Sequence, residues 1–222
     1  MQANLRETQM IKLIHDCAEN HAGRYDMIFT DPPFEMSGET IRSILSNFDF
    51  DHLVLICSAH QMLDFYNKSD LEFAWQMVFD FKTPTKNRSL KQPHIQHANI
   101  AYFRKQGVKS AFDRSRVVRQ DHYSDEKNHY YPSIFHAPKS GMAYKYQKNQ
   151  SMIDDLIGAF DVQTVCDPFA GSGTTGLACL EHQKDCTLIE VDDDAFAIMK
   201  SQFSLLGESR LQIIENEELS NE

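Results

Sequence analysis

The sequence predicts a single α/β domain built on a mostly parallel sheet with helices on its faces. Two observations support this fold class. Short apolar runs alternate with amphipathic helical patterns over most of the chain, and two of these runs end in turns rich in proline or glycine. A chain of 222 residues can bury one sizeable core and carry a modest insertion, so a second full domain is not expected.

The apolar runs predict seven strands, two of which are expected to pair at one edge of the sheet. In chain order, the expected strands are residues 10–15, 25–30, 53–57, 72–81, 98–104, 163–167 and 186–190. A helical period predicts helices at residues 37–47, 59–67, 148–160, 173–183 and 193–205. The chain is acidic from Gly207, and we expect this tail (207–222) to fray.

The net charge of −10 looks wrong for a nucleic-acid-binding protein, but the charges are unevenly distributed. Residues 82–148 hold fourteen Lys and Arg residues and four Asp and Glu residues, a net charge of +10, which leaves −20 on the rest. Aromatic residues such as Tyr102, Phe112 and Tyr131 lie between these charges, as expected of a surface that neutralises phosphates and stacks on bases. An ordinary solvated loop that happens to be basic is the alternative.

A glycine-containing loop follows the expected strand at 163–167 and leads into a helical pattern. The loop reads Asp167-Pro168-Phe169-Ala170-Gly171-Ser172-Gly173-Thr174. Glycines let a backbone turn sharply and approach a ligand, and a helix N-terminus offers free amides. Glu190 ends the next strand 19 residues after Gly171, a spacing that suits a carboxylate accepting hydrogen bonds from ribose hydroxyls. The loop lacks the Gly-Lys-Ser/Thr ending of a phosphate-binding loop, so a nucleoside without phosphates fits better.

A second turn, Asp31-Pro32-Pro33-Phe34, follows the expected strand at 25–30 and so lies where open α/β sheets bind ligands. Consecutive prolines make the turn rigid. The carboxylate of Asp31 and the carbonyl of Pro32 can each accept one N–H of an exocyclic amine, and Phe34 can stack on its base. An ordinary rigid turn is the alternative explanation.

Together, these two motifs resemble the amino-methyltransferases of DNA, whose hallmarks are an Asp-Pro-Pro-Phe-like turn and a Phe-x-Gly-x-Gly loop. The turn comes first, the basic segment second and the glycine loop last, an order similar to the circularly permuted β group. The resemblance spans residues 10–205. It implies the Rossmann-like fold of S-adenosylmethionine-dependent methyltransferases, with a seven-stranded, mostly parallel sheet and an antiparallel edge strand.

The resemblance also assigns parts of the chain. It implies a catalytic half at 1–104, a target-recognition segment at 105–147 and a cofactor-binding half at 148–206. The implied catalytic residues are Asp31, Pro32, Pro33 and Phe34. The implied S-adenosylmethionine-binding residues are Asp16, Asp31, Lys148, Asp167, Phe169, Ala170, Gly171, Ser172, Gly173, Thr174 and Glu190.

The resemblance further implies the substrate, because Asp at the head of the turn usually accompanies adenine in this family, whereas Ser accompanies cytosine. We therefore expect transfer to the N6 amine of a flipped-out adenine in double-stranded DNA. The candidate DNA contacts are Lys86, Arg88, Lys91, Arg114, Arg116 and Arg119.

Three alternatives stay open: a cytosine-N4 or RNA amino-methyltransferase, a non-catalytic nucleic-acid-binding module, and a methyltransferase of proteins or small molecules. The five cysteines are odd in number and none shows Cys-x-x-Cys spacing, so no metal is expected. The sequence has neither a membrane span nor a signal peptide, which favours the cytoplasm of a bacterial or phage-infected cell. Relatives often pair, so a homodimer is possible.

Overall fold

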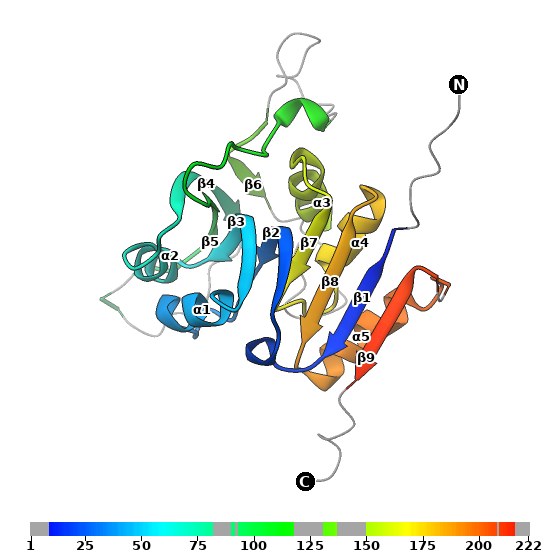
Figure 1. The fold of residues 1–222 in the computed structure, drawn as a ribbon. Helices are drawn as coiled ribbons and strands as arrows, with labels where there is room; N and C mark the ends of the chain where they lie inside the picture. Colours follow the sequence, from blue (N-terminus) through cyan, green and yellow to red (C-terminus); the bar gives the residue numbers. More distant parts are fainter. Residues whose placement is uncertain are drawn as a thin grey trace.

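The computed structural model describes residues 9–81, 90–91, 93–117, 131–136, 150–207 and 209–215. Within these ranges, nine strands form one sheet in the order β6-β4-β5-β3-β2-β7-β8-β1-β9 (Figure 1). The strands are β1 (Ile11–His15), β2 (Gly23–Thr30), β3 (Phe48–Cys57), β4 (Glu72–Asp80), β5 (His97–Arg104), β6 (Ile134–His136), β7 (Thr164–Asp167), β8 (Asp185–Glu190) and β9 (Leu211–Glu215).

Five α-helices and two short 3-10 helices connect these strands in the described part of the chain. They are α1 (Gly38–Leu45), α2 (Ala59–Tyr66), α3 (Gln150–Ala159), α4 (Thr174–Glu181), α5 (Asp193–Phe203), η1 (Ala18–Asn20) and η2 (Arg114–Arg116). The α/β class and the mostly parallel sheet are thus confirmed, and each of the seven expected strands and five expected helices has a counterpart within a few residues.

The sheet differs from the expected one in three ways. It has nine strands rather than seven among the described residues. The strand that runs opposite to its neighbours, β5, lies inside the sheet between β3 and β4 and not at an edge. β9 occupies residues 211–215, inside the segment expected to fray, and pairs in parallel with β1. β6 has only three residues, too few for a period of its own, and β9 lies in the acidic segment after Gly207 that we expected to fray. Each pairs with the backbone of a neighbouring strand.

Helices cover both faces of the sheet (Figure 1), because side chains alternate between the faces along each strand. In β2, Met27 and Phe29 belong to a buried cluster with residues of α3, α4 and α5. Ile28, between them, belongs to a second cluster with Ile41 and Ile44 of α1. Because the central strands are buried on both faces, their sequences are continuously apolar and do not alternate between apolar and polar residues.

β2 and β7 are neighbours at the point where the strand order changes direction. Met27 pairs with Val165 and Ile28 with Cys166. After β2, the chain passes through α1 to β3 on one side, and after β7 it passes through α4 to β8 on the other. Ligands of open α/β sheets bind at such a switch point, outside the carboxyl ends of the strands. None of the helices in the described ranges is long and apolar enough to span a membrane.

Candidate functional site

A cavity of about 520 Å³ opens at the carboxyl ends of β1, β2, β7 and β8, which are close together in the sheet. Small-molecule sites commonly have volumes of about 300–1,000 Å³. Residues that end or directly follow these strands form its walls, namely Asp16, Asp31, Pro168 and Glu190. The cavity therefore brings together the proline turn and the glycine loop, although Asp31 and Gly171 are 140 residues apart in the sequence.

The Asp31–Phe34 turn forms one wall of this cavity. Asp31 is half-buried, Pro32 is buried and the Phe34 ring is 39% exposed. The Pro33 carbonyl accepts a hydrogen bond of 3.0 Å from the Met36 amide, which closes a tight turn. This geometry places a carboxylate and an exposed aromatic ring side by side at the cavity, where a planar base can meet both.

The glycine loop also lines the cavity and depends on two left-handed residues. Gly171 has φ +54° and Gly173 has φ +89°, values that residues with a Cβ adopt only with strain. A Cβ on Gly173 would lie 2.8 Å from Met199 Cγ, so this glycine also permits α5 to pack closely. A Cβ on Gly171 would meet no atom within 4 Å, because this residue faces the open cavity. Its backbone is therefore accessible to a ligand.

Two carboxylates, those of Glu190 and Asp16, line the same cavity. Glu190 accepts hydrogen bonds from the Gly171 amide at 2.6 Å and from the amides of Val191 and Asp192 at 3.0 and 2.8 Å. These bonds fix the side chain against the glycine loop. A carboxylate has about four acceptor positions, so Glu190 can accept a further hydrogen bond from a hydroxyl group.

Asp16 is held in a similar way at the end of β1. Its Oδ1 accepts hydrogen bonds from the Cys17 amide at 2.7 Å and from Asn20 Nδ2 at 2.9 Å, and His21 Nε2 lies 3.0 Å from Oδ2. Burial raises the pKa of Asp16, but the bonds from Asn20 and Cys17 and the nearby His21 outweigh it, and the pKa falls below its usual value. Asp16 is therefore a carboxylate at neutral pH.

Asp167 lies behind the cavity wall and joins the two halves of the site. Its Oδ1 accepts hydrogen bonds from Thr30 Oγ1 at 2.9 Å and the Phe169 amide at 3.1 Å, and its Oδ2 accepts one from Thr175 Oγ1 at 2.6 Å. Burial and, to a smaller extent, the charge of Asp31 together raise the pKa of Asp167 to about 7 despite these bonds. Thr30 immediately precedes the proline turn and Thr175 lies in the first turn of α4, so one carboxyl group connects both motifs.

The structure brings most of the expected site residues together at the cavity. Those that line it are Asp16, Asp31, Pro32, Pro33, Phe34, Phe169, Gly171 and Glu190. Asp167, Ala170, Ser172, Gly173 and Thr174 support the loop without lining the cavity. Lys148 lies outside the described residues.

Several lining residues had not been expected from the sequence. Cys17, Ala18, Glu19, Pro168 and Val191 directly follow or lie between motif residues, so extending each motif along the chain would have found them. Ile44 of α1 and Ala195 of α5 reach the cavity through helix packing, for which the sequence carries no motif.

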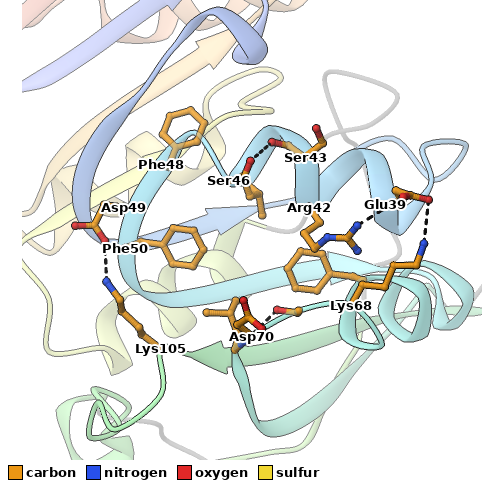
Figure 2. A pocket seen from close by; sticks show the side chains of 14 residues that line it. Glu39, Arg42, Ser43, Ser46, Phe48, Asp49, Phe50, Lys68, Asp70 and Lys105 are labelled. Atoms are coloured by element: carbon orange, nitrogen blue, oxygen red, sulfur yellow. Dashed lines mark hydrogen bonds and ion pairs between the residues drawn. The ribbon is translucent and has the colours of Figure 1, made fainter.

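A second hollow, of about 610 Å³, lies at the amino end of β3 against α1 and the end of α2 (Figure 2). The charges on its rim neutralise one another. Lys68 Nζ is 3.2 Å from the Glu39 carboxylate and Lys105 Nζ is 3.0 Å from the Asp49 carboxylate. No residue of either motif lines it. We therefore assign the candidate site to the smaller cavity, at the sheet edge where open α/β folds bind ligands.

The expected DNA contacts are only partly described. Lys91, Arg114 and Arg116 are exposed, and Arg116 Nη1 is 3.0 Å from the Asp161 carboxylate. Lys86, Arg88 and Arg119 lie outside the described residues.

Of the aromatic residues expected at the basic surface, Tyr102 belongs to the core, and Phe112 and Tyr131 lie against it. Tyr102 is fully buried, and Phe112 and Tyr131 pack against the main core cluster with their ring centroids 5.2 Å apart. The expectation of surface stacking was therefore wrong for Tyr102, whereas Phe112 and Tyr131 are only partly buried. An aromatic residue between charges in the sequence can still point inward when a strand or a packed loop carries it.

A sequence profile of the DNA methylase family matches residues 42–201, most of the chain. No curated protein sequence matches significantly. Among solved structures, the fold is similar to that of M1.HpyAVI in its SAM complex, at 22% identity and a TM-score of 0.67, covering 88% of this chain and all of that one.

Two further solved structures share the fold. A putative DNA modification methylase from Thermus thermophilus, complexed with S-adenosyl-L-methionine, is 14% identical with a TM-score of 0.65, over 91% of this chain and 99% of that one. The cytosine-N4-specific PvuII DNA methyltransferase is 13% identical with a TM-score of 0.61, over 83% of this chain and 80% of that one.

Proposed function

The chain belongs to the DNA methylase family of N6 and N4 amino-methyltransferases, and we propose that it methylates the N6 amine of adenine in DNA with S-adenosylmethionine as the donor. The observation that carries this proposal is the shared cavity. The Asp31–Phe34 turn lines the same cavity as Gly171, Glu190 and Asp16.

The lining residues suit S-adenosylmethionine, which has a nucleoside part without phosphates and a cationic centre. Glu190 can accept hydrogen bonds from ribose hydroxyls, and the exposed backbone at Gly171 permits close approach. The charge of Asp16, ionised at neutral pH, gives the wall a negative potential. When bound, the cofactor supplies a methyl group attached to positively charged sulfur.

At the Asp31–Phe34 turn, this chain's residues bind and orient the acceptor. The lone pair of an exocyclic amine is delocalised into the base, which makes the amine a poor nucleophile. The Asp31 carboxylate and the Pro32 carbonyl each accept one of its N–H groups, which favours the tetrahedral nitrogen whose lone pair is available. Phe34, 39% exposed, stacks on the base.

No covalent bond to the protein is needed, since alignment alone can supply about 7–11 kcal/mol of a barrier. Extruding the base from the duplex costs a few kcal/mol, which these contacts offset. In this proposal, the basic segment that includes Lys91, Arg114 and Arg116 holds the duplex phosphates, while the negative charge elsewhere limits DNA to that side.

Replacing Asp31 tests the assignment. We expect Asp31→Ala to lower kcat by about 10²–10³-fold, the usual cost of removing one preorganised polar group at a reacting centre. The affinity for S-adenosylmethionine should change little, because the glycine loop, Glu190 and Asp16 are intact. Retained turnover in the variant would rule out this role for the turn.

Cytosine N4 is the second candidate target, because the fold is also similar to that of a cytosine-N4-specific enzyme. The chemistry of the turn is the same for both amines. Digestion of methylated DNA to deoxynucleosides followed by mass spectrometry distinguishes N6-methyl-2′-deoxyadenosine from N4-methyl-2′-deoxycytidine. Sequencing the DNA of expressing cells for modified bases then gives the recognition site.

A further inference from the structure

We propose that Gln61, a residue of α2 outside both motifs, is a positioning residue that holds the Asp31–Phe34 turn in its base-binding geometry. The Gln61 side chain is 2% exposed. Its Nε2 donates hydrogen bonds to the Pro33 carbonyl at 2.8 Å and to the Met36 carbonyl at 2.9 Å. The two carbonyls flank Phe34, so a single amide group holds both ends of the tight turn that carries this ring.

The position of Gln61 is itself fixed by the sheet. Its Oε1 accepts a hydrogen bond of 2.9 Å from the Ser58 amide, and its own amide donates to Ser58 Oγ at 3.2 Å, which forms a capping box at the start of α2. Ser58 directly follows β3, and β3 is the neighbour of β2, from which the turn emerges. Three hydrogen bonds of one side chain, two from Nε2 and one to Oε1, thus connect the turn to the segment that follows the adjacent strand.

The chain after the turn also lies directly against α2. A Cβ on Gly38 would be 2.6 Å from the Gln61 carbonyl oxygen, so only glycine permits this approach. The Glu39 amide donates a hydrogen bond of 3.1 Å to Asp64 of α2. With the two bonds from Gln61, these contacts fix the turn at both ends and leave Phe34 exposed at the cavity.

The inference rests on the proposed function, because a rigid turn affects turnover only if the turn binds the acceptor base. Without Gln61, each of the two carbonyls loses a buried donor, and the turn can reorient towards water. A displacement of about 1 Å at a reacting centre can reduce turnover by about 10²-fold. The contacts of Gln61 are to α2 and the turn, so the glycine loop should keep its geometry.

Gln61→Met tests this role, because Met has a similar length and removes the polar atoms. Gln9→Met is the matched control. Gln9 Nε2 likewise donates to two carbonyls, of Cys179 at 2.8 Å and Lys184 at 2.7 Å, but at the amino edge of the sheet. We expect kcat to fall about 10–100-fold in Gln61→Met, with the Kd for S-adenosylmethionine within about twofold of wild type. Gln9→Met should retain wild-type kcat and Kd even if its stability falls.

A double-mutant cycle with Phe34→Ala separates positioning from general destabilisation. If Gln61 acts through the turn, Gln61→Met should lower kcat by a much smaller factor in the Phe34→Ala background than in the wild type. The effect of Gln9→Met on kcat should be the same in both backgrounds. If Gln61→Met does not fold, Gln61→Glu provides the same test, because it keeps the shape and the acceptor for Ser58, while its carboxyl group, protonated by burial, can donate only one hydrogen bond in place of two.

Three outcomes would overturn the inference: wild-type kcat in the Gln61 variant, equal losses in both backgrounds, or a kcat loss matched by Gln9→Met. If the wild-type protein itself methylates no DNA, the proposed function fails instead, and this result is seen before any variant is compared.

Discussion

Asp167 is expected to make the fold less stable as the pH rises from about 4 to about 7. Burial raises its pKa from 3.8 to about 7. Between these values, the folded protein keeps a proton on Asp167 that the unfolded chain has released. The free energy of unfolding therefore falls with rising pH, by at most about 1.4 kcal/mol per pH unit from this group. Over the whole interval, the loss is about 4 kcal/mol, and it ends above the folded-state pKa.

Asp167→Asn removes this titration and conserves the shape of the side chain. The Asn oxygen can accept from Thr30, and its amide can donate to Thr175 Oγ1, which now accepts. Urea unfolding of both proteins between pH 4.5 and 7.5 measures the difference in stability at each pH. As the pH rises, we expect the free energy of unfolding of Asp167→Asn to increase by several kcal/mol relative to that of the wild type. Parallel stability curves would refute the reasoning.

Asp26 provides a control of opposite sign. Burial raises its pKa, but hydrogen bonds from the amides of Gln163 and Thr164 outweigh this effect, and the pKa is lowered. The ionised form therefore stabilises the fold above the unfolded-state pKa of about 4, and this stabilisation is lost as the pH falls towards the folded-state pKa. Asp26→Asn should be less stable than wild type at pH 7, by an amount that shrinks in acid.

Three further predictions concern the glycine loop and Asp16, which we propose bind the cofactor. Gly173→Ala should destabilise the fold by about 1–3 kcal/mol in urea unfolding, because a Cβ at φ +89° is strained and meets Met199; an unchanged midpoint would contradict this packing. Gln202→Met removes a hydrogen bond of 2.6 Å to the Ser172 carbonyl and should weaken S-adenosylmethionine binding about 2–10-fold by calorimetry; unaltered affinity would show that this bond does not hold the loop. Asp16→Asn should weaken the same binding about tenfold, the effect of about 1.4 kcal/mol, and equal affinity would exclude Asp16 from the cofactor site.

The sequence predicts those site residues that belong to a motif and also end or directly follow a predicted strand. Asp31 and Glu190 each end or directly follow an apolar run, and Gly171 lies in a loop between a strand and a helix. Parallel strands place their carboxyl ends at one edge, so predicting the strands also predicted where these residues converge. The cavity lined by all three agrees with that prediction.

Other parts of the site depend on packing that leaves no pattern in one sequence. Gln61 looks like any polar residue near the start of a helix, and its role appears only when the neighbouring turn is in place. Ile44 reaches the cavity because α1 packs on the sheet. The place of β5 between β3 and β4 follows from pairing registers, which a period of two cannot reveal.

The adjacency of β2 and β7 explains why the order of the motifs along the chain does not disturb the site. Each motif needs its own strand to end at the same sheet edge, and the pairing of Met27 with Val165 and of Ile28 with Cys166 secures this. The hydrogen bond between Thr30 and Asp167 then joins the strand ends themselves. The described residues 105–117 and 131–136 take no part in this pairing. We therefore expect that changes in the segment proposed for target recognition leave the carboxylate of Asp31 in place relative to the glycine loop. Under the proposed function, specificity for a DNA sequence and the chemistry of methyl transfer would then depend on different parts of the chain.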